Sequence, residues 1–227
     1  MVYFEEQQVM FKLFKFVFLA LFLVIRPILA QPVAVVSTEA RQWANFKGHE
    51  LIEALGESDL VSKYAKLDKM MLEDINLDYV AKFVIGKYAR LMNDEQKQRY
   101  HDLFQRYVLS LYKQASFSFD ASRLGFSIES VTEYPKFTNV VCAVNPGQLN
   151  KDIKLEKIPV KFKLIRGLNN RIQAVDLEIS SVSMVIEYRK RFYQMIQAEN
   201  ENMDWFLDKL NDKVIANEEN ILPRKVL

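Results

Sequence analysis

The sequence is poor in the residues on which most catalytic and metal sites depend. Only two of its 227 residues are histidine, His49 and His101, and only one is cysteine, Cys142. Both histidines fall in predicted helices beside charged neighbours, which is typical of surface residues, and with one distant cysteine they make a poor zinc site. Cys142 lies in an apolar stretch without a partner for an intrachain disulfide bond, so we expect a buried thiol. Since no glycine-rich phosphate loop is present either, we predict that the chain is not an enzyme and carries no metal and no cofactor.

The sequence is also low in glycine, and its net charge is small. Six glycines argue against long flexible linkers, and 31 basic residues nearly balance 29 acidic ones. A chain without a strong positive charge has no electrostatic footprint for nucleic acid, so we expect no nucleic-acid partner. Without its first thirty residues, the chain is long enough for one sizeable domain or for two small subdomains that share a core.

The first thirty residues have the pattern of a secretory signal peptide. Lys12 and Lys15 precede an apolar run over residues 16–25, and Ala30 is the small residue that closes the segment. A run of about ten apolar residues matches a signal peptide and is shorter than the ~20 that span a bilayer. We therefore expect cleavage after Ala30, with Met10 as the true start. A retained membrane anchor is the alternative.

Four helices are predicted between residues 37 and 112 from apolar residues spaced by three and four. The first spans Thr38–Leu55, and its larger apolar side chains are expected to form the buried face: Trp43, Phe46, Leu51, Ile52 and Leu55. Ser58 is expected to cap the second helix. The third helix follows Asn76 and contains Gly86, whose propensity cost of about 1 kcal/mol suggests a close packing contact.

The fourth helix is the clearest of these. Asn93 followed by Gln96 resembles a capping box at its start. A long apolar stripe comes next: Tyr100, Leu103, Phe104, Tyr107, Val108, Leu111 and Tyr112. We expect this stripe to pack against another large apolar surface.

After about residue 115 the apolar period changes from helical to alternating, which predicts strands. They begin at Phe117 and continue through Val140–Val144, Ile158–Leu164 and Ile172–Leu177, before helical spacing returns in residues 182–197 and 205–214. Helices, then consecutive strands, then two helices indicate an α+β fold with a curved antiparallel sheet. Periodicity alone does not separate a filled core from a cavity for an apolar ligand.

A short basic segment, Tyr188–Arg191, lies on the penultimate helix. It is either a solvated helix face or a contact for lipid phosphate or an acidic partner.

Two motifs resemble a known family. The first is Asp74–Tyr79, followed by Val84–Tyr88, Asp94–Gln96, Tyr100, Phe104 and Leu111–Tyr112; the second is Val182-Ser183-Met184. Their order and type resemble the MlaC (toluene-tolerance) family across essentially the whole mature chain. The chain departs from that pattern where Tyr88 or Ala89 stands near the usual tryptophan, where Ser181 replaces the usual glycine, and in the turn 167–170.

The resemblance implies a soluble periplasmic carrier that holds phospholipid by its acyl chains. Its implied partners are an outer-membrane lipoprotein complex and an inner-membrane lipid ABC transporter complex, and the implied role is outer-membrane lipid asymmetry. The implied fold is a helical subdomain with a nuclear-transport-factor-like curved sheet enclosing an apolar cleft. We expect a monomer with a signal peptide at 1–30, one domain at 31–217 and a polar tail at 218–227. Within the domain, residues 31–114 are expected to be mainly helical, 115–180 to form the sheet and 181–217 to return to helices.

Three alternatives remain open at this point. A hopanoid-associated relative would bind a polycyclic lipid in the same fold. An enzyme with a cone-shaped sheet would need a polar pocket, and a membrane-anchored adaptor would retain the leader.

The candidate lipid-binding residues follow from strand alternation and from the helical stripes. They are Phe83, Phe104, Val108, Tyr112, Phe117, Val141, Val160, Phe162, Leu164, Val175, Met184 and Tyr188.

Overall fold

The computed structural model describes residues 33–114, 124–145, 148–150, 153–154, 156–167 and 170–221. All of them belong to the second of the two units into which the chain divides, Pro32–Leu227. The predicted signal peptide and Phe117 lie outside the described residues. Within the described part of the chain, no helix combines the length and apolar character that crossing a bilayer requires.

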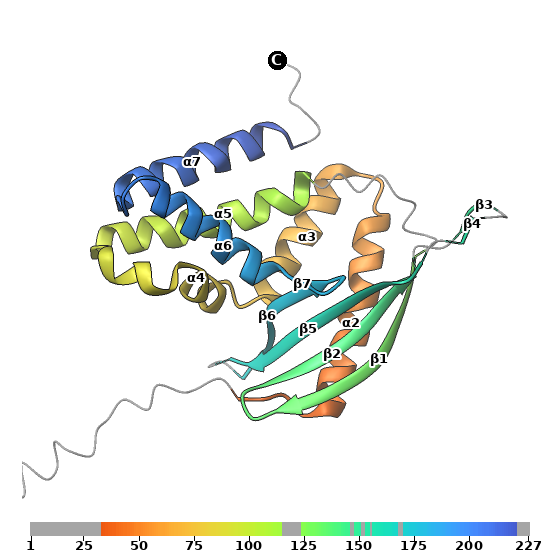
Figure 1. Ribbon diagram of the computed structural model, residues 1–227. Helices are drawn as coiled ribbons and strands as arrows, with labels where there is room; N and C mark the ends of the chain where they lie inside the picture. Colours follow the sequence, from red (N-terminus) through yellow and green to blue (C-terminus); the bar gives the residue numbers. More distant parts are fainter. Residues whose placement is uncertain are drawn as a thin grey trace, which may run out of the picture. The chain divides into compact units, whose positions relative to one another are not determined.

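The described helices fall into a run before the sheet and a pair after it (Figure 1). Those before the sheet are α2 (Ser37–Gly56), α3 (Leu60–Asp74), α4 (Leu77–Ile85), the 3-10 helix η1 (Gly86–Leu91) and α5 (Asp94–Gln114). Those after it are α6 (Met184–Ala198) and α7 (Met203–Glu219). This order, with the sheet between the two sets, confirms the predicted α+β class.

The main sheet is antiparallel throughout and follows the order β1-β2-β5-β6-β7. Its strands are β1 (Gly125–Tyr134), β2 (Phe137–Asn145), β5 (Ile158–Arg166), β6 (Ile172–Ile179) and β7 (Val182–Ser183). A separate pair consists of β3 (Gln148–Asn150) and β4 (Ile153–Lys154). The register shifts once in β1–β2 and once in β5–β6, and such bulges bend the strands, which are visibly curved in Figure 1.

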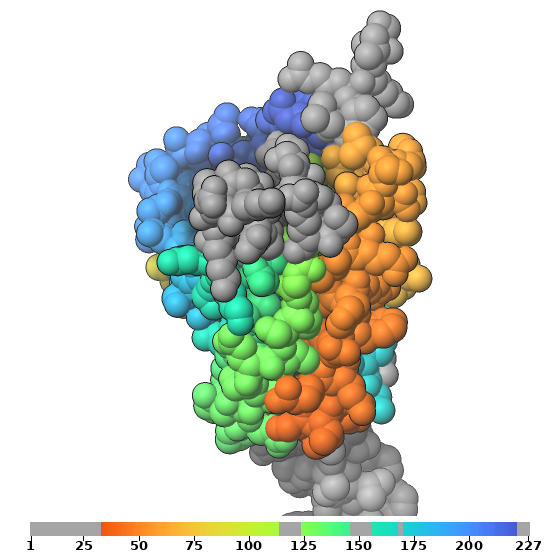
Figure 2. Space-filling model, turned by 90° about the vertical axis from the view of Figure 1, so that its right-hand side faces the viewer, coloured from red at the N-terminus to blue at the C-terminus, as the bar shows by residue number. Residues whose placement is uncertain are grey.

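Helix α2 covers one face of the sheet, and Figure 2 shows it running beside β1. Between them lies a hydrophobic group that we call the sheet cluster: Val35, Ala40, Ala44, Val140, Cys142, Leu164 and Ala174. Larger half-buried side chains pack around it, among them Trp43, whose ring meets that of Phe162 edge-on at 5.9 Å. The sheet is therefore held to α2 by a buried aliphatic group, with larger aromatic and aliphatic side chains packed around it.

The other helices share a second core, the helical cluster, built from α4, η1, α5, α6 and α7. Rings from α5, α6 and α7 meet within it at centroid distances of 5.5–6.3 Å: Tyr100, Phe104, Tyr107, Phe192 and Phe206. The Tyr100 hydroxyl donates to the Ala81 carbonyl at 2.9 Å, which satisfies its polar end inside the core. This packing confirms that the apolar stripe of residues 100–112 faces a large apolar surface.

The predicted start of α5 is also confirmed. The Asn93 N–H donates to Gln96 Oε1 at 3.0 Å, and the Gln96 N–H donates to Asn93 Oδ1 at 2.8 Å. These reciprocal bonds are those of a capping box.

Helix α2 buries Leu55 as predicted, but the other buried residues of this helix are small. Phe46 is 65% exposed and Leu51 is 37% exposed, whereas Ala40, Ala44 and Gly48 are buried. The backbone approaches the sheet so closely that a Cβ on Gly48 would lie 2.5 Å from the Phe126 ring. Large side chains cannot fit that gap, so the assignment of Phe46 and Leu51 to the buried face is wrong.

Two helix ends also differ from the prediction. The N-cap of α3 is Asp59, whose carboxylate accepts from the Ser62 N–H at 2.8 Å, and not Ser58. Gly86 ends α4 and does not lie inside it: its φ of +49° is a conformation that side chains disfavour. The close contact expected at Gly86 is present, since a Cβ there would lie 2.9 Å from Arg189 Nη2.

Candidate functional site

Helix α3 lies where the hydrophobic clusters meet. Leu67 and Met70 pack with Ala54 and Leu55 of α2 in a third group, the end cluster, which Tyr112 and Leu124 border. Met71 packs against the helical cluster, and Ile75, just past the helix, packs against both the helical and the sheet clusters. The surface of α3 is therefore the seam between the helical layer and the sheet.

The end of α3 is attached to β6 through the backbone. Ile75 forms a parallel bridge with Ala174, and the Asn76 N–H donates to the Ala174 carbonyl at 2.9 Å. The Gln173 amide donates to the Glu73 carbonyl at 3.1 Å. Asn76 then caps α4 by accepting from the Tyr79 N–H at 3.0 Å, so α4 begins where α3 meets the sheet.

Side-chain charges hold α3 to its two neighbouring helices. Asp74, which is only 8% exposed, lies 2.8 Å from Nζ of Lys47 in α2. Asp68 accepts from the Tyr112 hydroxyl and lies 2.7 Å from Nζ of Lys113 in α5. In the described part of the chain, backbone-to-backbone hydrogen bonds join the end of α3 to β6, whereas the bonds from α3 to α2 and α5 involve polar side chains.

The candidate residues on helices fall in different places. Phe104 and Val108 are buried in the helical cluster, and half-buried Tyr188 meets Tyr107 edge-on at 6.1 Å on its border. Tyr112 borders the end cluster. The structure thus brings Phe104, Val108 and Tyr188 together and puts Tyr112 nearer the seam.

Two further candidate residues lie on α4 and α6, outside the buried core. Phe83 is 37% exposed on α4, and Met184 is half-buried at the first position of α6. Neither belongs to the buried core of the helical cluster.

The candidates on strands lie on two faces of the sheet. Residues paired directly across strands share a face, and Val160, Phe162 and Leu164 pair with Cys142, Val140 and Thr138 on the α2 side. Val141 pairs with Lys161, whose ammonium lies 2.5 Å from Glu178, so Val141 belongs to the opposite, more polar face. Val175 is the extra residue at the β5–β6 register shift and is buried. The bulge therefore interrupts the alternation of faces along β6, so alternation does not predict the face on which Val175 lies.

Sequence reasoning missed three residues of the seam, namely Met70 and Met71 of α3 and Ile75, which directly follows the helix. Leu67 and Met71 are spaced as one helical stripe, but such a stripe does not show that three clusters meet on it. The sequence signal for the seam is the apolar pair Met70-Met71. Two adjacent apolar residues widen the helical stripe, so that it can contact two cores.

Among the described residues, His101 contacts two carboxylates and Cys142 is a buried free thiol. His101 lies 2.5 Å from Asp78, and this hydrogen bond raises the pKa of the imidazole. Burial of Cys142 raises the pKa of its thiol to about 12, which keeps it protonated and unreactive. Across the described ranges no three His, Cys, Asp or Glu side chains gather in a way that could hold a metal ion.

Comparisons with known proteins agree on the fold. The family model described as MlaC protein matches residues 50–212. The structure is similar to that of the phospholipid-binding protein from Ralstonia solanacearum in complex with a phospholipid, with a TM-score of 0.64 and 13% identity. The alignment covers 79% of this chain and 98% of that chain. No curated protein matches the chain.

Proposed function

Because the chain belongs to the MlaC family, as the match over residues 50–212 shows, we propose that it binds phospholipid by its acyl chains and carries it through the periplasm. Its proposed partners are an outer-membrane lipoprotein complex and an inner-membrane lipid transporter complex. The phospholipid in the similar Ralstonia solanacearum structure supports this choice of ligand. The proposal requires no catalytic step.

The acyl chains are proposed to lie along the α3 seam. The apolar side chains there are only half-buried, which leaves them surface to give to a ligand: Met70, Met71, Ile75, Tyr112 and Leu124. Each methylene buried is worth about 0.8 kcal/mol, so two chains would gain enough to compete with a bilayer. The seam is the single observation on which this placement rests.

Uptake and release are proposed to occur by movement of α3 away from α2 and α5. The Lys47–Asp74 and Asp68–Lys113 ion pairs are the links that such a movement would break. Charged side chains can exchange these contacts for water, whereas the α3–β6 backbone bonds would stay in place as the pivot.

The test is mass spectrometry of lipid that copurifies with the exported chain and with two variants. Met70→Glu puts a charge into the seam, and Leu72→Glu makes the same change at a side chain of α3 that is 44% exposed. We expect phospholipid on the wild type and on Leu72→Glu, and its loss from Met70→Glu. Thermal unfolding of each variant reports whether it is folded.

Two results would count against the proposal. If a folded Met70→Glu variant keeps its lipid, the proposed placement of the acyl chains in the seam is wrong. If the copurified lipid instead has the mass of a hopanoid, the ligand is a polycyclic lipid and not a phospholipid.

Export is proposed to follow cleavage after Ala30. Sequencing the amino terminus of the protein recovered from the periplasm should give Gln31 first. An amino terminus upstream of residue 16 would instead support a retained membrane anchor.

A further inference from the structure

Arg189 of α6 is fixed on the surface between α4 and α6. Its Nη1 donates to the Phe83 carbonyl at 3.2 Å, and its Nη2 donates to the Tyr193 hydroxyl at 2.9 Å. The guanidinium carbon lies 4.9 Å from the centre of the Phe83 ring and 5.0 Å from that of Tyr193. Two rings and two hydrogen bonds therefore hold the guanidinium in one place.

Among the described residues, the Arg189 guanidinium contacts a carbonyl, a hydroxyl and two aromatic rings, and it has no carboxylate partner. Its remaining N–H groups have no recorded acceptor in that part of the chain. A guanidinium presents several donors in a planar fork that matches the oxygens of a phosphate. The donors that remain are therefore available to an anion.

Tyr193 supplies a further donor beside them. Its hydroxyl oxygen accepts from Arg189 and also from the Lys87 N–H at 3.3 Å. With its oxygen accepting both bonds, the hydroxyl retains its own proton for donation. Within the described residues no acceptor for that proton is recorded, so Arg189 and Tyr193 present donors side by side.

Gly86 makes this arrangement possible. Its Cα lies so close to the pair that a Cβ would collide with the Tyr193 hydroxyl and lie 2.9 Å from Arg189 Nη2. Its positive φ is also a conformation that glycine adopts at low cost. The end of α4 is thus shaped around the Arg189–Tyr193 pair.

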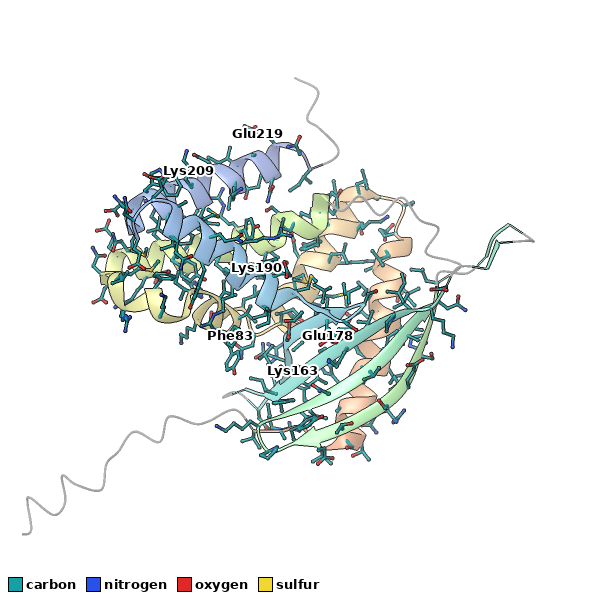
Figure 3. All side chains as sticks on the ribbon, viewed as in Figure 1. Phe83, Lys163, Glu178, Lys190, Lys209 and Glu219 are labelled. Atoms are coloured by element: carbon teal, nitrogen blue, oxygen red, sulfur yellow. The ribbon has the colours of Figure 1, made fainter. Side chains whose placement is uncertain are left out.

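The surroundings are basic. From Tyr79 to Leu91 the chain carries Lys82, Lys87 and Arg90 and no acidic residue, and α6 carries Glu187 as its single acid. Lys190, adjacent to Arg189, is exposed on α6 and is labelled in Figure 3. The local field therefore favours an anionic ligand.

A purely structural role for Arg189 would be to cap the carboxyl end of α4, where basic side chains commonly meet the last carbonyls. That role uses the bond to Phe83 but not the Tyr193 hydroxyl proton or the unpaired edge of the guanidinium. Anion binding uses all of them.

We propose that Arg189 and Tyr193 form a binding site for a phosphate-type anion, and that this anion is the phosphodiester of the bound lipid. The second part rests on the proposed function. Helices α4 and α6 both pack against β6, and α4 starts at the α3 seam. Phe83 lies seven residues after Asn76, the N-cap of α4, which is about 10 Å along the helix axis, and it is labelled in Figure 3. A phosphate at Arg189 would therefore be within reach of chains in the seam.

The test compares two lipids with the same chains, dioleoylphosphatidylglycerol and dioleoylglycerol, which lacks the phosphate. Delipidated wild-type chain is equilibrated with both, and the bound ratio is read by mass spectrometry. We expect Arg189→Gln to reduce the preference for the phospholipid about tenfold or more, since charge-assisted hydrogen bonds are lost. Tyr193→Phe should reduce it less, and Arg189→Lys should restore part of it.

Arg191→Gln is the matched control, because Arg191 has the same charge two positions along α6 and is exposed. It should keep the wild-type ratio. An unchanged ratio in folded Arg189→Gln would overturn the lipid assignment.

Inorganic phosphate, added alone, separates the two possible sources of the anion. If it raises the melting temperature of the wild type but not of Arg189→Gln while the lipid ratio is unchanged, the anion site stands and its ligand is free phosphate. If phosphate has no Arg189-dependent effect and the ratio is also unchanged, the anion site is wrong. Failure of both lipids to bind any variant would refute the proposed function, and the phosphate arm would still decide the site.

Discussion

The ammonium group of Lys47 in α2 lies 2.8 Å from the carboxylate of Asp74 at the end of α3 and 2.7 Å from Glu50. Burial raises the pKa of Asp74 in spite of this neighbouring cation. Burial also acts to lower the pKa of Lys47, but hydrogen bonds to Asp74 and Glu50 outweigh it and leave that pKa raised. Among the described residues Lys47 neutralises an Asp74 oxygen that accepts no other hydrogen bond, so the pair links α2 to the seam.

Replacing Lys47 by Met should destabilise the fold by about 2 kcal/mol, because it leaves a largely buried carboxylate without its cation. Urea unfolding at neutral pH measures this loss. The double variant Lys47→Met/Asp74→Asn should recover most of it, since the buried charge is then gone. The deficit of the single variant should also shrink as the pH falls and Asp74 is protonated. Equal losses in the single and double variants would show that the charge on Asp74 is not what Lys47 stabilises.

The His101–Asp78 pair should make stability depend on pH near neutrality. The hydrogen bond to Asp78 raises the pKa of folded His101 above its ordinary 6.5. A raised pKa means that the stabilisation is fully present below 6.5 and is lost as the pH rises through the folded value. For this part-exposed pair we expect a difference of about 0.5 kcal/mol between wild type and His101→Gln at low pH. Urea midpoints should differ near pH 6 and converge near pH 9, and a constant difference would contradict the assignment.

Ser181→Gly should stabilise the chain by about 1 kcal/mol. Ser180 and Ser181 form the turn between β6 and β7 with φ of +49° and +68°, where a side chain is strained and glycine is not. Thermal unfolding reports the gain. Ser127→Gly in β1, which has no positive φ, is the control and should lose stability by about 0.5–1 kcal/mol. A loss at Ser181 as well would mean that the turn does not carry this strain.

Cys142 should not react with thiol reagents in the folded chain. The side chain is fully buried, and burial raises the pKa of its thiol to about 12. An aromatic disulfide reagent at pH 8 should therefore label the chain only as fast as it unfolds. The same reagent in concentrated urea gives the rate of the exposed thiol, and similar rates in both conditions would contradict the burial.

Local signals in the sequence predicted local structure well. The capping box at Asn93 and Gln96 needs only four consecutive residues, and its two hydrogen bonds are present. Strand alternation through Ile158–Leu164 placed β5 correctly. In both cases the determining interactions lie within a few residues or repeat with a fixed period.

The inward face of α2 could not be predicted in this way. The large apolar residues Phe46 and Leu51 suggested one face, but the close approach of Phe126 from β1 selects Gly48 and the alanines. Hydrophobicity ranks side chains by size as well as polarity, but it carries no information on how closely the partner element packs. The bulge at Val175 has the same effect in β6, because one extra residue interrupts the alternation of faces.

By itself, the sequence determined the α+β class, the order of helices and strands, and membership of the MlaC family, because these depend on periodicity, caps and motifs along the chain. The tertiary structure decided which residues meet: α3 between three clusters, Lys47 on Asp74, and Arg189 between Phe83 and Tyr193. Phe83 and Arg189 are more than a hundred residues apart in sequence. Such contacts follow from how α4 and α6 pack together, which no local pattern in either helix specifies.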